Sequence, residues 1–296
     1  MTDVVVIGAG SAGAVVAARL SERSGRRVTL LEAGPDHDSA HTPPSIAGAS
    51  FVEAMREPGR VWDPLDAVRA DAQTPRRYTR GRGTGGSSAV NAMVALPGEP
   101  DDYDEWARIH GLRSWGWEHV RPWFDRVAVP VAPAPTFGAV SAAVMAAGGE
   151  AARLTRFPDG RRASVNDVYL EPVRARPNLV IRGDAEVLRV VIQGRRVIGV
   201  ELADGSTIDT NAVVVCAGAI HSPRILLRSG VDLEGVGQGL QDHPSFPVTI
   251  RLREEHWLQP GVPAVSSLLR ATYRRRHDLQ VLPLDEADPT LPGLGV

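Results

Sequence analysis

Two short runs of apolar residues near the start of the chain predict buried β-strands. They span residues 4–7 and 28–31 and consist mainly of valine, isoleucine and leucine. Short runs of this kind are typical of parallel sheets that are covered on both faces. Residues 15–20 between them carry apolar side chains at helical spacing. The order strand, helix, strand therefore predicts an α/β fold that is built on a parallel sheet.

The pattern changes further along the chain, where short strands and turn residues follow one another. Residues 179–181 predict one strand, and residues 187–192, 197–202 and 207–209 predict three more. The pair Asp204-Gly205 before the last of them is a strong hairpin signal. These three strands are expected to form a three-stranded antiparallel meander.

A last apolar run, residues 212–216, predicts a further parallel strand, and a helix follows it. Ser222 and Pro223 are residue types that favour an N-cap and the first helical position. Gly230 is typical of a helix end. The N-terminus of this helix is expected at the edge of the sheet where doubly wound folds bind their ligands.

A glycine motif follows the first predicted strand directly. It reads Gly8-Ala9-Gly10-Ser11-Ala12-Gly13, and the second strand ends on Glu32. In this order the glycines permit a tight turn, close approach of a pyrophosphate, and packing of the helix on the strand. A carboxylate at Glu32 would accept hydrogen bonds from ribose hydroxyls and would repel the 2′-phosphate of NADP. The motif predicts dinucleotide binding but does not distinguish FAD from NAD.

A second glycine-rich stretch, Gly81–Asn91, lies between an arginine-rich segment and an apolar run. Glycine lets a backbone approach a flat ligand closely, and consecutive N–H groups can form a concave anion site. The alternative is a flexible linker. The apolar residues that follow favour a ligand-binding loop.

The composition narrows the class of protein. The chain has 296 residues, 43% of them hydrophobic, and a formal net charge of −2, so a large core can form and nothing favours nucleic-acid binding. Its single cysteine, Cys216, favours a reducing compartment. Neither a signal-peptide pattern nor an apolar run of membrane-spanning length stands out. We predict a cytoplasmic protein without a metal site and leave peripheral membrane contact open.

Several parts of the chain together resemble the glucose–methanol–choline (GMC) family of FAD-dependent oxidoreductases. The unit from Gly8 to Glu32 is similar to the family's ADP-binding motif. Gly81–Asn91 resembles its first signature, and Gly218–Gly230 resembles its second. Residues 236–244 are similar to a Val-Gly-x-Asn-Leu-x-Asp-His block, with glycine in place of asparagine at position 239. The resemblance covers nearly the whole chain.

The resemblance implies an α/β fold with two parts. One is a Rossmann-like FAD-binding domain, a parallel sheet with a three-stranded meander, and the other is a partial α+β substrate domain. The implied boundaries are 1–35, 75–95 and 165–245 for the discontinuous FAD-binding domain, and 36–74, 96–164 and 246–296 for the incomplete substrate domain.

The resemblance also implies roles for individual residues along non-covalently bound FAD. On the nucleotide half these are Gly8, Gly10, Ser11, Ala12 and Gly13 for the pyrophosphate, Glu32 for the ribose, Val187 for the adenine, and Ala217 and Gly218 closing over them. Along the flavin half they are Gly83, Gly85, Gly86, Ser87 and Asn91, with Asp242 and His243 near the ribityl chain. Members that attach FAD covalently carry histidine before the signature asparagine, a position held here by Val90.

The main departure from the family concerns its catalytic histidine, which pairs with a second histidine or an asparagine. His256 and His277 lack the expected glycine, threonine and methionine neighbours, and nothing after His243 resembles the family's closing segment. We therefore expect the catalytic residues beyond Val296 and interpret the chain as the N-terminal portion of a longer enzyme.

The chemistry implied by the resemblance is the oxidation of a small-molecule alcohol. A base removes the hydroxyl proton while hydride passes to flavin N5, and the electron acceptor is a carrier other than NAD. The short proline-rich middle and residues 92–96 are similar to mycofactocin-associated members, which makes reduced mycofactocin one expected substrate. Two alternatives stay open from the residues: an FAD-binding fragment without catalysis, and an NAD-linked Rossmann dehydrogenase.

Overall fold

The computed structural model describes residues 2–68, 73–243, 248, 250–257, 262–272 and 279–285. Its residues form two compact units. The first contains Met1–Asn91 and Ala163–Thr249, and the second contains Ala92–Arg162 and Ile250–Ala287. The segment 36–74, expected in the substrate domain, belongs to the first unit because residues such as Arg60 pack on the glycine loop at 81–91. The functional division of the chain stays a prediction. His277 and residues 286–296 lie outside the described residues.

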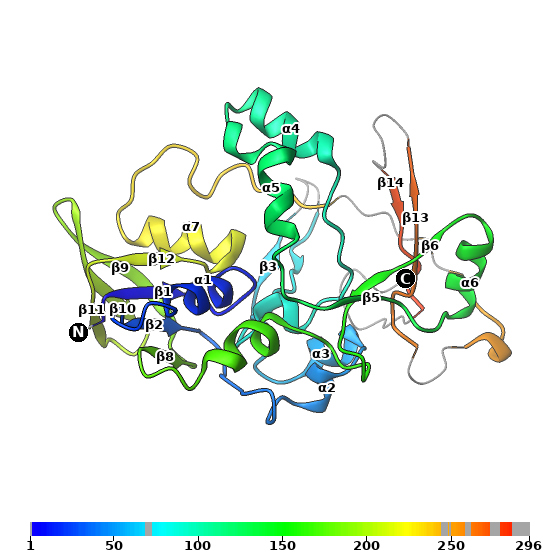
Figure 1. Cartoon of the computed structure of the whole chain (residues 1–296), viewed down its shortest axis with the longest axis horizontal. Coiled ribbons are helices and arrows are strands. Elements are labelled where there is room, and N and C mark those ends of the chain that lie inside the picture. Colours follow the sequence, from blue (N-terminus) through cyan, green and yellow to red (C-terminus); the bar gives the residue numbers. More distant parts are fainter. Residues whose placement is uncertain are drawn as a thin grey trace. The chain divides into compact units, whose positions relative to one another are not determined.

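A parallel sheet forms the centre of the first unit, as the apolar runs predicted. The order of its strands is β12-β1-β2-β8 (Figure 1), and all adjacent pairs are parallel. Their bounds are β1 (Val4–Ile7), β2 (Val28–Leu31), β8 (Leu179–Arg182) and β12 (Val213–Val215). Helix α1 (Gly13–Leu20) connects β1 to β2 and buries small side chains such as Ala14 and Ala17.

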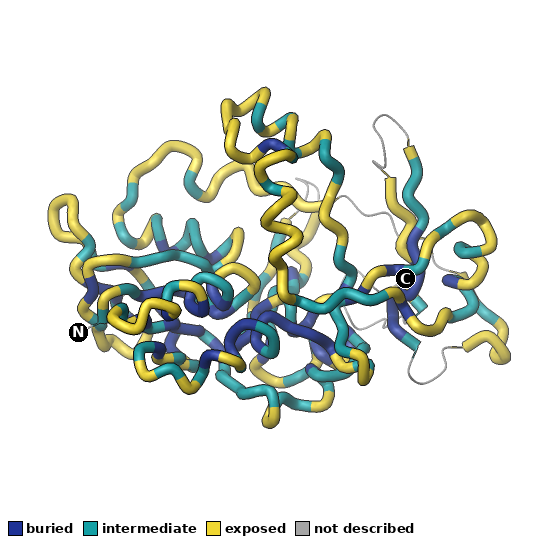
Figure 2. Tube along the Cα trace, in the orientation of Figure 1, coloured by how far each residue is buried: buried dark blue, intermediate teal, exposed yellow. Residues whose placement is uncertain are grey.

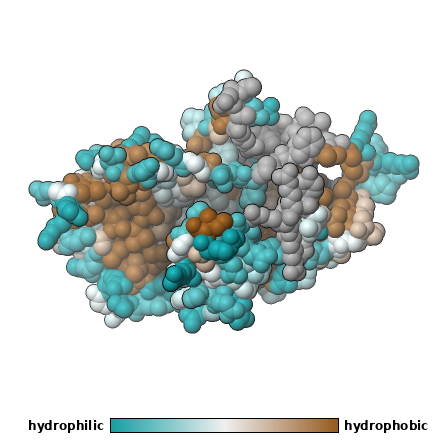
Figure 3. Space-filling view, turned by 90° about the horizontal axis from the view of Figure 1, so that it is seen from above, coloured by the Kyte–Doolittle hydropathy of each residue, from teal (hydrophilic) through white to brown (hydrophobic). Residues whose placement is uncertain are grey.

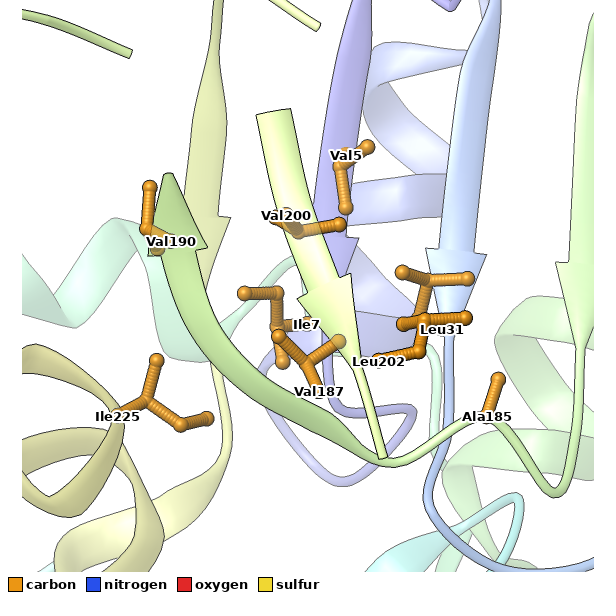
Figure 4. Packing of buried hydrophobic residues seen from close by; sticks show 9 residues of the cluster. All are labelled: Val5, Ile7, Leu31, Ala185, Val187, Val190, Val200, Leu202 and Ile225. Atoms are coloured by element: carbon orange, nitrogen blue, oxygen red, sulfur yellow. The ribbon is translucent and has the colours of Figure 1, made fainter. Parts of the chain in front are cut away.

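The predicted meander packs on this sheet. It consists of β9 (Val187–Gln193), β10 (Arg196–Leu202) and β11 (Thr207–Asp209), paired antiparallel in the order β11-β10-β9. Figure 4 shows the core that results: side chains of β1 and β2 meet those of β9 and β10, and Ile225 of the helix α7 closes one side. This core holds the carboxyl ends of β1 and β2 in place, and those ends carry the first glycine motif and Glu32.

Helix α7 spans Gly218–Arg228, so the expected start at Ser222 and Pro223 is wrong. Gly218 has a φ of +79°, and the chain turns there from β12 directly into the helix. Pro223 therefore lies inside the helix rather than at its first position. The expected end was correct, since Gly230 follows the C-cap Ser229 with a φ of +75°.

Short elements complete the first unit. They are α2 (Pro44–Ala47), α3 (Phe51–Arg56), the hairpin β3 (Asp66–Ala67) and β4 (Arg76–Arg77), the 3₁₀ turns η1 (Gly86–Ala89) and η4 (Glu171–Val173), and the π-helical turn η3 (Asn166–Leu170). Figure 3 shows a broad apolar area on the surface of this unit. Its exposed large apolar residues include Ile192, Leu227 and Leu240.

The second unit combines helices with short antiparallel strands. Its strands pair as β14-β13-β6 and β5-β7. The bounds are α4 (Pro100–Ile109), α5 (Trp117–Phe124), β5 (Val131–Pro133), α6 (Ala139–Ala146), β6 (Glu150–Ala151), β7 (Arg153–Thr155), β13 (Ser267–Ala271) and β14 (Leu279–Val281), with 3₁₀ turns at η2 (Arg113–Trp115) and η5 (Glu254–His256). The pair α4 and α5 is mostly exposed (Figure 2), and Tyr103 contacts both Trp106 and Trp117 there. Of the helices in the described ranges, none is both long and apolar enough to cross a membrane.

Candidate functional site

A cavity of about 500 Å³ opens in the first unit at the carboxyl ends of its parallel strands. This is the edge at which doubly wound sheets bind ligands, and the volume lies within the range of small-molecule sites. Many of the residues that the sequence predicted for the site line this cavity together. They are Gly8, Gly10, Ser11, Ala12, Glu32, Gly86, Ser87, Val187, Ala217 and Gly218.

The first glycine loop has the geometry that its motif requires. Gly8 has a φ of +95°, and a Cβ on it would lie 2.6 Å from the carbonyl oxygen of Cys216. A Cβ on Gly13 would lie 1.8 Å from the carbonyl oxygen of Gly8, so only glycine permits α1 to start this close to β1. Ser11 and Ala12 immediately precede α1 and line the cavity. The unpaired N–H groups and positive dipole end of a helix start are therefore at the cavity wall.

The second glycine loop packs directly against the first. The N–H of Gly85 donates to the carbonyl oxygen of Ala9 over 3.0 Å. A Cβ on Gly86 would lie 2.7 Å from the Cα of Gly10. The loop then forms the 3₁₀ turn η1, whose Ala89 is buried with Val90 in an apolar cluster. A flexible linker does not make such contacts, so the linker alternative is set aside.

Glu32 is buried between the two glycine loops. Its carboxylate accepts hydrogen bonds from the N–H groups of Ala9 (2.8 Å), Gly34 (3.0 Å) and Gly83 (2.8 Å). Burial raises the pKa of Glu32, while the three N–H donors and the charge of Arg60 oppose that rise. The carboxylate was expected to serve a ribose, but three of its acceptor positions already bind the backbone.

An aromatic pair on the cavity wall was not predicted as a site. The rings of Trp62 and His221 stack with their centroids 4.0 Å apart and an interplanar angle of 22°. Both residues line the cavity, and so do Arg80 and Arg224. Burial, followed by the charge of Arg224, lowers the pKa of His221, which favours a neutral imidazole. Among the histidines that the structure describes, His221 is the one that lines this cavity.

The remaining predicted site residues lie away from the cavity lining. Gly83 and Gly85 belong to the packed part of the second loop, and Gly13 to the helix start, whereas Asn91 is exposed after η1. These residues shape the cavity wall from behind or lie beside it, and their roles toward FAD stay predictions.

Asp242 and His243 are connected to the site only indirectly. Asp242 accepts hydrogen bonds from the Tyr78 hydroxyl and from the Arg80 guanidinium. These partners, led by the Tyr78 hydroxyl, lower the pKa of Asp242 to about 2. The His243 side chain is fully exposed. Arg80 lines the cavity, so Asp242 can orient Arg80 without lining the cavity itself.

The parallel sheet and the two glycine loops at its edge define a dinucleotide-binding fold of a known family. The family profile described as GMC oxidoreductase matches residues 2–155 and 147–245, and the chain belongs to this family. The oxygen-dependent choline dehydrogenases of Klebsiella pneumoniae (strain 342) and Escherichia coli O6:K15:H31 (strain 536 / UPEC) are each 33% identical to it. Their alignments cover 88% of this chain and 59% and 58% of those proteins.

Solved structures agree with this assignment. The pyridoxine 4-oxidase from Mesorbium loti is 26% identical, with a TM-score of 0.75 that covers 96% of this chain and 65% of that one. A formate oxidase that is 23% identical shares the fold, with a TM-score of 0.62 over 76% of this chain and 47% of that one. The chain spans 59% of the length of the first of its curated relatives. Members of the family bind FAD, which sets aside the NAD-linked alternative.

The residues of the cavity fit FAD. The two glycine loops and the start of α1 provide backbone N–H groups for a pyrophosphate, and Arg80 and Arg224 provide positive charge. Ile7, Leu31 and Val187 provide apolar surface for a flat ring. Val90 is buried among Ile46, Ala54 and Ala89, so the position that carries a linking histidine in some members is here part of a core.

Proposed function

We propose that the chain binds FAD non-covalently in this cavity and serves an oxidoreductase that oxidises an alcohol. The observation that carries the proposal is the direct contact of two glycine loops at one sheet edge, Gly86 against Gly10, within a member of the GMC family. When bound, FAD supplies a hydride acceptor at N5 of its ring system.

The chain's own residues would divide the binding between them. The start of α1 at Ser11 and Ala12 would hold the pyrophosphate, with Ser87 on the opposite wall. Val187, at the start of β9, would meet the adenine. Arg80, which Asp242 orients, would add positive charge. The stacked Trp62 and His221 would exclude water from one side of the cavity.

The substrate class is a small alcohol, in line with the choline dehydrogenases among the relatives. Reduced mycofactocin is a narrower proposal, and its support is the resemblance of residues 92–96 and of the proline-rich middle stretch. The electron acceptor would be a carrier other than NAD. The catalytic base is proposed outside the cavity lining, because His221 stacks on Trp62 and His243 is fully exposed.

An absorption spectrum of the purified protein tests the binding step. Protein that carries the cofactor is expected to be yellow and to release FAD on acid precipitation. Colourless protein that does not take up added FAD but binds NAD in a titration would overturn the proposal.

Dye reduction with a panel of alcohols tests the catalytic step. Turnover supports the oxidoreductase, whereas FAD binding without turnover supports the non-catalytic alternative. If turnover is seen, His221→Asn and His243→Asn are compared. A larger loss for His221→Asn would then reflect the changed cavity wall, because His221 stacks on Trp62 there, and would not mark His221 as the base.

A further inference from the structure

The backbone of Gly83 and Thr84 is held by two charged side chains from different parts of the chain. The N–H of Gly83 donates to Glu32 over 2.8 Å, and the carbonyl oxygen of Thr84 accepts from the Arg60 guanidinium over 2.8 Å. Glu32 comes from the end of β2, and Arg60 comes from the segment that follows α3. The acidic side chain of Glu32 thus holds the N–H of Gly83, while the basic side chain of Arg60 holds the carbonyl oxygen of Thr84.

Arg60 is buried to an unusual degree for an arginine. It is 3% exposed, although arginine is rarely buried this far without a partner. Its guanidinium also reaches the carbonyl oxygen of Pro35 at 3.5 Å, and its Nε finds no partner within the described residues. A Cβ on Gly83 would lie 2.7 Å from Nη1 of Arg60, so the glycine is what lets the guanidinium lie against the loop.

The same carboxylate also binds the first glycine loop. Glu32 accepts from the N–H of Ala9 with one oxygen and from the N–H of Gly83 with the other. The loops contact each other independently through the hydrogen bond from Gly85 to Ala9. Glu32 therefore bridges the two walls of the cavity, and Arg60 fixes the second wall from its far side.

We propose that Glu32 and Arg60 form a clamp that holds the second glycine loop against the first, and that Arg60 is a positioning residue for the cavity. Arg60 does not line the cavity and acts through the backbone of Thr84. The clamp exists without a ligand, because all of its bonds are within the chain. Its importance for FAD rests on the proposed function, in which the second loop contacts the flavin half and the first loop contacts the ADP half.

Binding experiments can distinguish a clamp from a Glu32 that serves only as a ribose acceptor. A ribose acceptor stabilises bound FAD and bound ADP equally and has no partner in Arg60. A clamp positions the loop on the flavin side, so its loss weakens FAD binding more than ADP binding. It also couples Glu32 to Arg60 in the protein without ligand.

The experiment uses the full chain freed of flavin, with the variants Glu32→Gln, Arg60→Met and the double variant. Glu22→Gln and Arg19→Met serve as matched controls, since these residues form an exposed ion pair. Urea unfolding measures the stability of each apoprotein, and flavin fluorescence and calorimetry measure binding of FAD and of ADP. Arg60→Lys keeps the charge without the forked donor and replaces Arg60→Met if that variant does not fold.

We expect Glu32→Gln and Arg60→Met each to weaken FAD binding about ten- to a hundredfold, as for loss of hydrogen bonds to a charged group. ADP binding should fall by a smaller factor. The double variant should lose less than the product of the two single losses, because both residues hold the same backbone. The control variants should bind both ligands like the parent.

Two results would overturn the clamp. One is an Arg60→Met apoprotein with parental stability and parental FAD affinity. The other is an equal loss of FAD and ADP affinity in Glu32→Gln without coupling to Arg60. If the parent binds no FAD yet the two residues are coupled in urea unfolding, the clamp stands and the proposed function fails.

Discussion

The two glycine loops of the cavity use glycine for different reasons. In the first loop the space that a Cβ would need is taken by the backbone of the sheet to which the loop belongs, since Gly13 lies against Gly8 and Gly8 lies against Cys216 after β12. At two glycines of the second loop it is taken by residues far away in the sequence. Gly86 meets Gly10, and Gly83 meets Arg60. The first loop is thus shaped by the strands and helix of its own sheet, and the second is shaped by the surface on which it packs.

This difference has an energetic meaning. A side chain added to the first loop would separate α1 from β1 and would damage the parallel sheet itself. A side chain added to the second loop would move this loop away from the first loop and so separate the two walls of the cavity, while the sheet itself stays intact. We therefore expect the first loop to control the stability of the first unit and the second loop to control ligand binding.

The largest effect is expected for Gly13→Val. The added Cβ would lie 1.8 Å from the carbonyl oxygen of Gly8, and neither backbone can move without moving β1 or α1. The free energy of unfolding should fall by about 3 kcal/mol or more, at the upper end of overpacking effects. Urea unfolding of the apoprotein measures it.

Gly25→Ala is the control for that variant, since a Cβ there would have no neighbour within 4 Å and its φ is not positive. It should unfold like the parent. A Gly13→Val protein as stable as the Gly25→Ala protein would contradict the view that the first loop is fixed by its own packing.

A smaller effect on stability is expected for Gly86→Ala. The added methyl group would meet the Cα of Gly10 at 2.7 Å, and alanine would also have to adopt a φ of +51°. Together these should cost about 1–3 kcal/mol of stability. FAD binding should fall disproportionately, because the two cavity walls move apart.

Gly111→Ala separates the two causes. Gly111 has a φ of +67° with nothing within 4 Å of an added Cβ, so its alanine variant should lose only about 1 kcal/mol from backbone strain. Equal stability losses in both variants, with flavin content unchanged in Gly86→Ala, would show that the loops do not depend on their mutual contact.

The smallest effect concerns the contact of Asp242 with Tyr78 and Arg80. The pKa of Asp242 is lowered from 3.8 to about 2, so the carboxylate contributes its full stabilisation above pH 3.8 and loses it as the pH falls through 2. The side chain is 44% exposed, which limits the contribution to about 0.2–1 kcal/mol.

Asp242→Asn tests this by urea unfolding at neutral pH and at successively lower pH. The difference in stability between parent and variant should be present at neutral pH and shrink as the pH falls below 3.8. A difference that grows toward low pH would have the wrong sign for a lowered pKa.

The comparison of the loops also explains what could be predicted from the sequence. Local sequence patterns predict the first loop, the strands β1, β2 and β12, and the meander, because apolar runs and turn residues indicate the secondary structure in which they lie. The position of Glu32 beside the first loop follows from the same pattern. Its hydrogen bond to Gly83 does not, because it joins positions on separate elements that only the folded chain brings together.

The parts that were missed depend on tertiary contacts. Arg60 and Trp62 lie in a stretch without periodicity, and their roles arise from packing on the second loop and on His221. The start of α7 was misplaced because Ser222 and Pro223 have the residue types of a helix start, while the turn at Gly218 already provides one. The place of His221 in the cavity wall could have been predicted from a helix start at Gly218, because His221 lies about one helical turn after that residue.

Pro223 changes the hydrogen bonding of the part of α7 that lines the cavity. Its ring nitrogen cannot donate to the carbonyl oxygen four residues earlier, which belongs to Ala219, and Ala219 is part of the cavity wall. In a regular helix that oxygen would accept a hydrogen bond from the backbone N–H of residue 223. Pro223 removes that hydrogen bond, so the first turn of α7, which lines the cavity, is held by one backbone hydrogen bond fewer than a regular helix would have there.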